Sequence, residues 1–181
     1  HIADIKRTVA IAHQMGIKVN IYLEDWSNGM KNSPEYVFAL VDALKDEGIE
    51  RFMLPDTLGV LNPDSTYSFA SQMVERYPSL HFDFHPHNDY DLAVANVLAA
   101  VKAGIKGVHT TMNGLGERAG NAPLASVVAS IHDHTNFKTN IVEQKINKVS
   151  RMVETYTGVH IPANKPVVGE NVFTLCAGIH A

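Results

Sequence analysis

The chain has 181 residues, of which 45% are apolar and 19% charged, and a formal net charge of −4. That length is typical of one globular domain, and the weak negative charge argues against nucleic acid or a membrane surface as the main partner. The single cysteine, Cys176, excludes an intrachain disulfide framework, and with no membrane-length apolar run or secretory leader the sequence predicts a cytoplasmic location.

Strand and helix patterns alternate along the chain. Helical spacing of apolar residues predicts helices at residues 2–15, 34–47, 62–78, 91–104, 122–134 and 141–158. Apolar alternation predicts strands at residues 17–26, 50–59, 80–85 and 105–114. Ser33 and Asn62, each followed by proline, are the predicted N-caps of the second and third helices.

The order of these elements, one helix and then four βα units, predicts a parallel α/β fold. Strand starts recur about every 30 residues, the period of a βαβ array with right-handed crossovers. A doubly wound open sheet and a (β/α)₈ barrel both fit this order. The chain is roughly 70 residues shorter than a typical complete barrel, and four strands do not close one. The periodicity therefore leaves an open four-stranded sheet and half of a barrel as alternatives.

Ionisable side chains collect on one face of the third predicted strand. Alternation places Phe82 and Phe84 on the face packed against helices, and on the opposite face it places His81, Asp83, His85 and His87. A His-x-His pair at a strand end brings two imidazoles within reach of one ion. His85 and His87 are therefore predicted metal ligands, and the alternative is a pair of satisfied histidines without a ligand.

The other predicted strands also end on polar residues. The segment YLEDW (22–26) places Tyr22 and Glu24 on one face, LPDTLG (54–59) ends its strand on Asp56 and Thr57, and the last strand runs into a glycine-rich loop that reaches Asn121. Each segment alone is explained by a solvated charge, a turn cap or a tight bend. Together, polar groups at four strand ends are typical of a barrel whose active site is built from βα loops.

Four motifs carry a family resemblance: LPDTLG, FHPHND, NGLGERAGN, and PVVGENVF followed by AGIHA. They resemble the acyl-CoA-dependent 2-oxo acid condensing enzymes, the citramalate, 2-isopropylmalate and homocitrate synthases, which are related to hydroxymethylglutaryl-CoA lyase. The resemblance implies that residues 1–158 form the C-terminal half of a catalytic (β/α)₈ TIM barrel, strands five to eight, in a fragment of a longer chain. Residues 159–181 would begin the linker that follows the barrel.

The same resemblance implies the chemistry and the residues that perform it. The implied reaction is a metal-dependent Claisen condensation of acetyl-CoA with a 2-oxo acid, of the citramalate or 2-isopropylmalate synthase type, in branched-chain amino-acid (leucine) biosynthesis, by a homodimer. The implied cofactor is a divalent ion, Mg²⁺, Mn²⁺ or Zn²⁺. The implied roles are metal binding by His85, His87 and Asn121, catalysis by Glu24 and His180, and substrate binding by Tyr22, Thr57 and Asn113.

One part of the family's site has no counterpart in this sequence. The third metal ligand of the family, an aspartate, and the adjacent substrate-binding arginine lie on the first strand of the barrel, and no Arg-Asp-Gly type segment occurs here. The isolated chain is therefore expected to be inactive. Two alternatives stay open: a metal-dependent lyase or aldolase of the same superfamily, and a half-barrel without catalytic activity.

Overall fold

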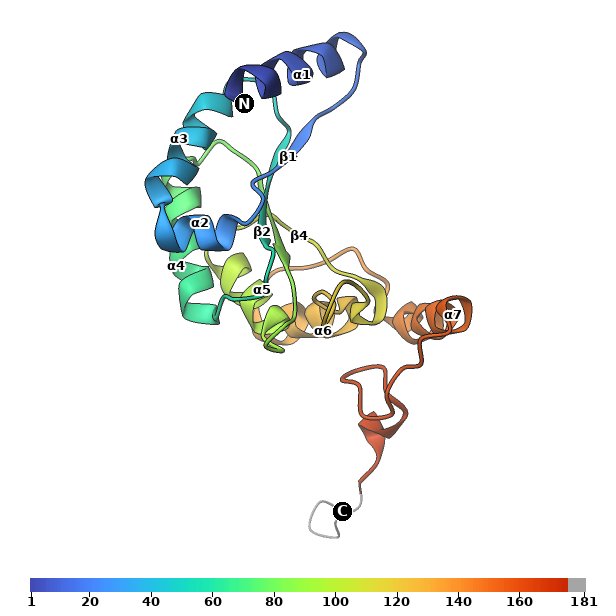
Figure 1. The fold of residues 1–181 in the computed structure, drawn as a ribbon. Helices are drawn as coiled ribbons and strands as arrows, with labels where there is room; N and C mark the ends of the chain where they lie inside the picture. Colours follow the sequence, from blue (N-terminus) through green and yellow to red (C-terminus); the bar gives the residue numbers. More distant parts are fainter. Residues whose placement is uncertain (176–181) are drawn as a thin grey trace.

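The computed structural model, which describes residues 1–175, is built on a four-stranded parallel sheet (Figure 1). The strands are Asn20–Tyr22 (β1), Arg51–Asp56 (β2), Phe82–Pro86 (β3) and Gly107–Val108 (β4). They lie side by side in chain order, β1-β2-β3-β4, without the reversal of order that defines a doubly wound sheet. The predicted parallel α/β fold is confirmed.

Helices connect successive strands. The α-helices are Ile2–Gln14 (α1), Trp26–Asn32 (α2), Pro34–Leu44 (α3), Pro63–Arg76 (α4), Ala93–Lys102 (α5), Leu124–His134 (α6) and Ile146–Thr157 (α7). Short 3₁₀ helices are Met112–Gly114 (η1), Glu143–Lys145 (η2) and Glu170–Phe173 (η3). Within residues 1–175, none of the helices has the length and apolar character needed to cross a membrane.

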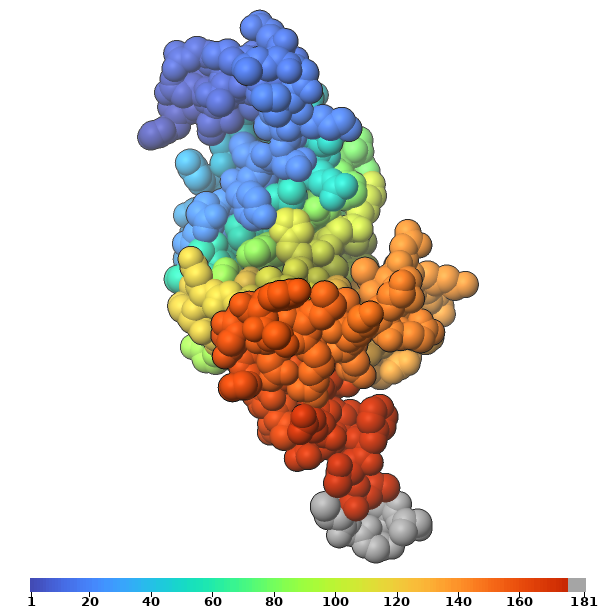
Figure 2. All heavy atoms as spheres, turned by 90° about the vertical axis from the view of Figure 1, so that its right-hand side faces the viewer, coloured from blue at the N-terminus to red at the C-terminus, as the bar shows by residue number. Residues whose placement is uncertain are grey.

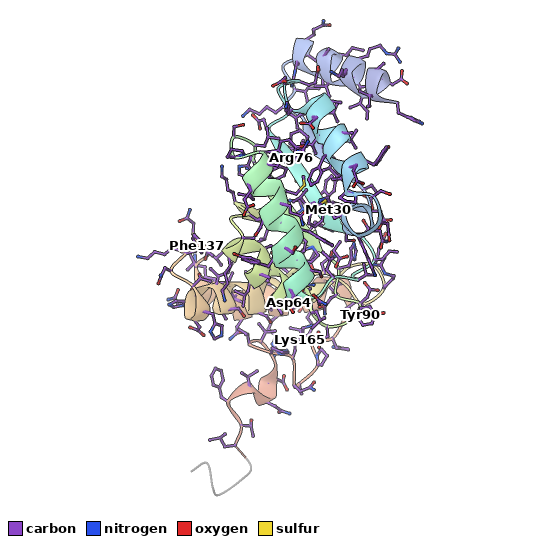
Figure 3. All side chains as sticks on the ribbon, turned by 90° about the vertical axis from the view of Figure 1, so that its left-hand side faces the viewer. Met30, Asp64, Arg76, Tyr90, Phe137 and Lys165 are labelled. Atoms are coloured by element: carbon purple, nitrogen blue, oxygen red, sulfur yellow. The ribbon has the colours of Figure 1, made fainter. Side chains whose placement is uncertain are left out.

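One face of the sheet packs against helices and holds the main core. In Figure 1, α3, α4 and α5 lie together on one side of the strands, and Figure 3 views α4 from this side, from Asp64 near its start to Arg76 at its end. The strand residues buried in this core are Phe52, Leu54, Phe82 and Phe84. The helix residues buried with them include Val41, Leu44, Met73 and Val97. The predicted outward orientation of the two phenylalanines of β3 is confirmed.

The opposite face of the sheet carries the polar side chains. Parallel pairing aligns Tyr22 with Met53, Met53 with Asp83, and Asp83 with Gly107, so these residues form one row across all four strands. Two residues further along each strand lies the next row, in which Pro55 pairs with His85. Figure 2 looks at this side, where green and yellow atoms from the middle of the chain reach the surface between the blue N-terminal part and the orange C-terminal part.

Several predicted boundaries are wrong, and each has a local cause. The strand predicted at 17–26 ends at Tyr22, because Asp25 adopts a left-handed conformation (φ 56°) and the chain then forms α2, which was not predicted. Trp26 anchors that helix, buried edge-on against two core phenylalanines. The strand predicted at 105–114 is only the two-residue β4, followed by η1.

The two predicted N-caps have different outcomes. Asn62 caps α4 as predicted: its side-chain oxygen accepts a hydrogen bond from the Ser65 backbone N–H, and the Ser65 hydroxyl accepts one from the Asn62 N–H. Ser33 precedes α3, but its side chain makes no capping hydrogen bond, so that prediction is wrong in its mechanism. Pro34 at the first position still starts the helix where expected.

Candidate functional site

Three histidines and a tyrosine gather where the strands end. The Nδ1 atoms of His85 and His109 are 3.2 Å apart, and the Tyr22 hydroxyl lies 3.2 Å from the same His109 nitrogen. The rings of His85 and His87 have centroids 5.3 Å apart, as do those of His85 and His109. The alternation of β3 thus brings both histidines of the His-x-His pair to the same side of the sheet, as predicted.

Asn121 lies directly beside His87. The two residues form an antiparallel bridge, flanked by hydrogen bonds from Asn88 N–H to Gly120 and from Ala122 N–H to Pro86. In this non-hydrogen-bonded kind of pair the Cα atoms are closest and both side chains project to the same side. The glycine-rich loop therefore folds back so that its last residue faces the strand end that carries the histidines.

Two buried polar atoms in this pair have no protein partner. His87 Nδ1 and Asn121 Oδ1 are buried without a hydrogen bond, while the Asn121 amide nitrogen donates to the Leu115 carbonyl at 3.2 Å. Gly116 makes room for that amide, since a Cβ at this position would overlap the Asn121 nitrogen. Buried polar atoms without partners are costly, so a free imidazole nitrogen and a free amide oxygen on one side of the sheet fit a ligand that accepts lone pairs.

A divalent cation is such a ligand, and imidazole nitrogen and amide oxygen are donors that it accepts. Among residues 1–175, no group of three or more His, Cys, Asp or Glu side chains is positioned to hold a metal ion. The donor set present, His85, His87 and Asn121, fits a divalent cation as an incomplete set of ligands. The predicted ions, Mg²⁺, Mn²⁺ and Zn²⁺, all accept these donor types, so the donor set does not select one of them.

Glu24 and Thr57 meet across the ends of β1 and β2. The Thr57 hydroxyl donates to Glu24 Oε1 at 2.7 Å and accepts the Asp25 backbone N–H at 3.1 Å. The threonine thereby fixes one oxygen of an otherwise exposed carboxylate and leaves the second oxygen free. A cavity of about 470 Å³ opens beside this pair and is lined in part by Tyr22 and Glu24.

Arg118 ties the loops together. Its guanidinium donates to both carboxylate oxygens of Asp89, at 2.8 and 3.0 Å, and to the Thr57 carbonyl at 2.7 Å. One side chain from the loop after β4 therefore joins the loops after β3 and β2, and through Thr57 it reaches Glu24. Hydrogen bonds from Arg118 hold the pKa of Asp89 below its usual value.

Burial and neighbouring charges shift the pKa values of two more groups, His85 and Tyr22. Desolvation, followed by the nearby His109 and His87, lowers the pKa of His85, which favours the neutral imidazole that binds metals. Desolvation, followed by the charges of Asp83 and Glu24, raises the pKa of Tyr22, so its phenol keeps its proton. Both shifts favour uncharged side chains at the strand ends.

The structure places most, but not all, of the predicted site residues together. Those at the strand ends are Tyr22, Glu24, Thr57, His85, His87 and Asn121. Asn113 instead donates through its amide to the Ser150 carbonyl of α7 at 3.0 Å, and within residues 1–175 it makes no hydrogen bond to the other predicted residues. His180 lies outside the described residues. Asp56 caps a turn, as in the structural explanation given for this segment, because its carboxylate accepts hydrogen bonds from two backbone N–H groups.

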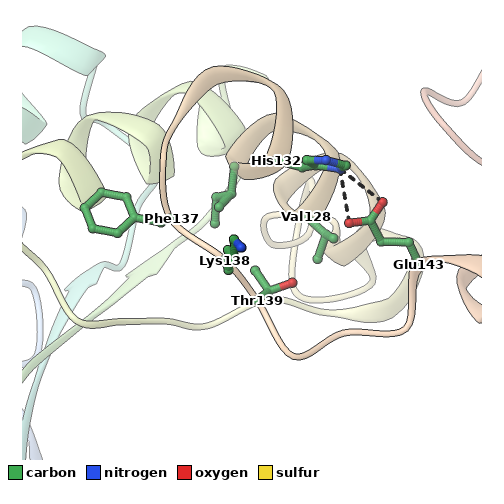
Figure 4. A pocket seen from close by; sticks show the side chains of 7 residues that line it. Val128, His132, Phe137, Lys138, Thr139 and Glu143 are labelled. Atoms are coloured by element: carbon green, nitrogen blue, oxygen red, sulfur yellow. Dashed lines mark hydrogen bonds and ion pairs between the residues drawn. The ribbon is translucent and has the colours of Figure 1, made fainter.

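Two residues of this site were missed from the sequence, His109 and Arg118. His109 was detectable, since the alternation that exposes Gly107 on the polar face of β4 also places residue 109 there. Arg118 lies in the motif NGLGERAGN, but its contact with Asp89 spans 29 residues and leaves no periodic signal. A separate pocket of about 240 Å³ lies beside α6, where His132 faces Glu143 at 3.3 Å (Figure 4). Its lining shares no residue with the strand-end site.

Comparisons of sequence identify relatives along nearly the whole chain. The HMGL-like family model matches residues 1–153. A homocitrate synthase of Sulfolobus acidocaldarius is 39% identical over 178 residues, which are 98% of this chain and 37% of that protein. A putative (R)-citramalate synthase of Methanopyrus kandleri is 40% identical over 177 residues, 97% of this chain and 34% of that protein. The chain thus spans little more than a third of the length of these relatives.

Comparisons of structure agree with the fold. An HMG-CoA lyase of Bacillus subtilis superimposes with a TM-score of 0.79 at 24% identity, covering 90% of this chain and 57% of the lyase. An HMG-CoA lyase of Acinetobacter baumannii, solved with coenzyme A and 3-methylmalate, gives the same TM-score and identity and covers 97% of this chain and 60% of the lyase. At this identity the likeness shows the fold alone. With the sequence relatives, it confirms the family resemblance carried by the four motifs.

Proposed function

Because this chain belongs to the HMGL-like family, we propose that it supplies half of the active site of a metal-dependent enzyme that condenses acetyl-CoA with a 2-oxo acid. Residues 1–158 are the C-terminal half of its catalytic barrel, and residues 159–181 begin the following linker. The observation that carries the proposal is the pairing of His85, His87 and Asn121 on the face that also holds Glu24. Strand order and helices on one side of the sheet support the half-barrel.

In this proposal His85, His87 and Asn121 hold the cation, with a further ligand from the part of the longer protein outside this chain. A bound divalent ion supplies Lewis-acid polarisation of the keto group of the 2-oxo acid. Tyr22, whose ring lies near that of His85, and Thr57, which donates to Glu24, orient the 2-oxo acid. His180, in the segment after the barrel, remains a proposed second catalytic residue.

Glu24 is the proposed base. Its Oε1 is occupied by the Thr57 hydroxyl, so Oε2 is the oxygen free to take a proton from the acetyl methyl group. The methyl carbon then forms a bond to the keto carbon while the carbonyl π pair moves to the keto oxygen, which takes up a proton to become a hydroxyl. Water hydrolyses the thioester to release the CoA thiol and a carboxylate. Since a carboxylate is a weak base for such a carbon acid, positioning by Thr57 is required for the step.

The test is made in the longer protein that contains this chain. Release of free thiol from acetyl-CoA is measured with pyruvate, 2-oxoisovalerate and 2-oxoglutarate, the acids that give citramalate, 2-isopropylmalate and homocitrate. We expect His87→Ala to abolish thiol release, while His132→Ala, in the separate pocket beside α6, leaves it unchanged. Full activity of His87→Ala at saturating Mn²⁺ would refute the metal assignment.

The same assay separates the two alternatives. A lyase or aldolase would cleave the product acid or its CoA ester and release no thiol from acetyl-CoA. The loop GLGERAGN lacks the cysteine carried by the corresponding loop of the lyases that it resembles, which favours the synthase. A half-barrel without catalytic activity would bind no Mn²⁺ even in the longer protein. For this chain alone, calorimetry is expected to show weak Mn²⁺ binding and no turnover.

The remaining expectations stay predictions. A homodimer is tested by light scattering of the longer protein, and a cytoplasmic location by fractionation. The specific 2-oxo acid, and with it a place in leucine biosynthesis, depends on which acid gives thiol release. The relatives named above favour testing 2-oxoglutarate and pyruvate first.

A further inference from the structure

A buried carboxylate, Asp83, lies on the polar face one row below the metal-ligand candidates. It is 1% exposed and accepts from Arg51 at 3.1 Å and from His81 at 2.8 Å. His109 Nε2 lies 3.4 Å from its second oxygen. Gly107, its neighbour on β4, leaves space for it, since a Cβ there would overlap the carboxylate. The mechanism proposed above gives this carboxylate no role.

This contact determines which ring nitrogen of His109 carries the hydrogen. An ionised carboxylate only accepts hydrogen bonds, so His109 Nε2 carries a hydrogen and donates it to Asp83. In a neutral imidazole only one nitrogen is protonated, and Nδ1 of His109 is therefore a bare acceptor. That acceptor is the nitrogen 3.2 Å from both the Tyr22 hydroxyl and His85 Nδ1.

The tautomer of His109 in turn determines which ring nitrogen of His85 carries the hydrogen. Two bare nitrogens at 3.2 Å would face each other with their lone pairs, so His85 Nδ1 carries the hydrogen and donates it to His109. Nε2 of His85 is then left unprotonated, in the state required of a metal ligand. We propose that Asp83 and His109 are positioning residues that hold His85 in the Nδ1–H tautomer, with its Nε2 lone pair free for a cation.

A carboxylate usually orients a metal-binding histidine by direct contact. Here the carboxylate orients the ligand His85 through a second imidazole, that of His109. The hydrogen bonds end at a carboxylate held by Arg51 and His81: His85 donates to His109, and His109 donates to Asp83. The Tyr22 hydroxyl is a second donor to the same nitrogen of His109. The assignment of the tautomer stands on the hydrogen-bond geometry, whereas its use in binding a cation rests on the proposed function.

Nitrogen-15 spectra of histidine-labelled protein test the tautomer directly. In two-bond ¹H–¹⁵N correlations of this chain without metal, we expect His85 to show a protonated Nδ1 and an unprotonated Nε2. The opposite tautomer for His85, with the hydrogen on Nε2, would overturn the proposal.

Three variants separate positioning from general loss of structure. His109→Leu removes the acceptor, and we expect His85 to become a mixture of tautomers. His109→Asn, whose Oδ1 can take the place of Nδ1, should restore the Nδ1–H form. His81→Leu is the matched control, because it also removes a donor to Asp83 but does not contact His85, and it should leave the tautomer unchanged. A His85 tautomer that stays the same in His109→Leu would contradict the proposal.

Metal binding distinguishes failure of this inference from failure of the proposed function. In the longer protein, calorimetry should show His109→Leu weakening Mn²⁺ binding by about 10- to 100-fold, and His81→Leu changing it much less. An Nδ1–H tautomer without any Mn²⁺ binding would overturn the cation-binding part together with the proposed function. Tight Mn²⁺ binding that His109→Leu leaves unchanged would overturn the positioning role while leaving the proposed function intact.

Discussion

The turn between β2 and α4 depends on one buried carboxylate, and its removal should destabilise the chain by a predictable amount. Asp56 is fully buried, and its two oxygens accept the backbone N–H groups of Val60 at 3.0 Å and Leu61 at 3.1 Å. Hydrogen bonds to a charged group contribute about 1.5–3 kcal/mol each. Since Val60 is partly exposed and regains water, we expect Asp56→Ala to lower the free energy of unfolding by about 3–5 kcal/mol.

Urea unfolding followed by circular dichroism measures the effect. Asp56→Asn keeps one acceptor and should lose about half as much, because its amide nitrogen faces a second donor. The matched control is Asp64→Asn, the same change at an exposed position in the first turn of α4, which should stay within about 0.5 kcal/mol. Equal stability of Asp56→Ala and the native chain would refute this account of the turn.

Three further predictions address the site and the core. Because Arg118 lowers the pKa of Asp89 in the folded state, their contact stabilises the fold above the unfolded aspartate pKa of about 4 and is lost as the pH falls through the lower folded value. Unfolding midpoints of native chain and Asp89→Asn should therefore differ at pH 7 and converge in acid. Gly116→Ala should weaken Mn²⁺ binding in the longer protein as much as Asn121→Ala does, measured by calorimetry, since its Cβ displaces the Asn121 amide. Phe84→Ala should cost about 3–5 kcal/mol in urea unfolding, and a loss below 1 kcal/mol would contradict its full burial.

The sequence predicted those features that repeat along the chain or sit beside each other in it. Alternation in β3 separated Phe84 from His85, and the Asn-Pro start of α4 identified its cap at Asn62. Prediction from the sequence failed where a contact with a residue distant in sequence determines the local conformation. The chain leaves the β1 strand because Trp26 is buried against phenylalanines from α4 and β3, and nothing periodic in residues 22–26 reveals that.

In the candidate site, too, some residues were predictable from local sequence and others were not. Its ligand candidates came from a short motif, because two imidazoles in i, i+2 positions on a strand always share a face. The contacts that support these ligand candidates were not predicted, because those contacts join different loops. Arg118 reaches the Thr57 carbonyl across 61 positions in sequence, and His109 reaches His85 across 24. Such contacts become visible only when the register of the strands is known.

The sequential order of the strands has a consequence for biosynthesis. Each strand pairs with the one made just before it, as when Met53 of β2 aligns with Tyr22 of β1, so every new strand meets its neighbour as it emerges from the ribosome. Pairing between successive strands keeps the partners as close in sequence as helical crossovers allow, and an N-terminal segment can order while the rest is still being translated. The Arg118 contact with Thr57 joins residues 61 positions apart, so the strand-end loops can be tied together only after the loop that follows β4 has been translated.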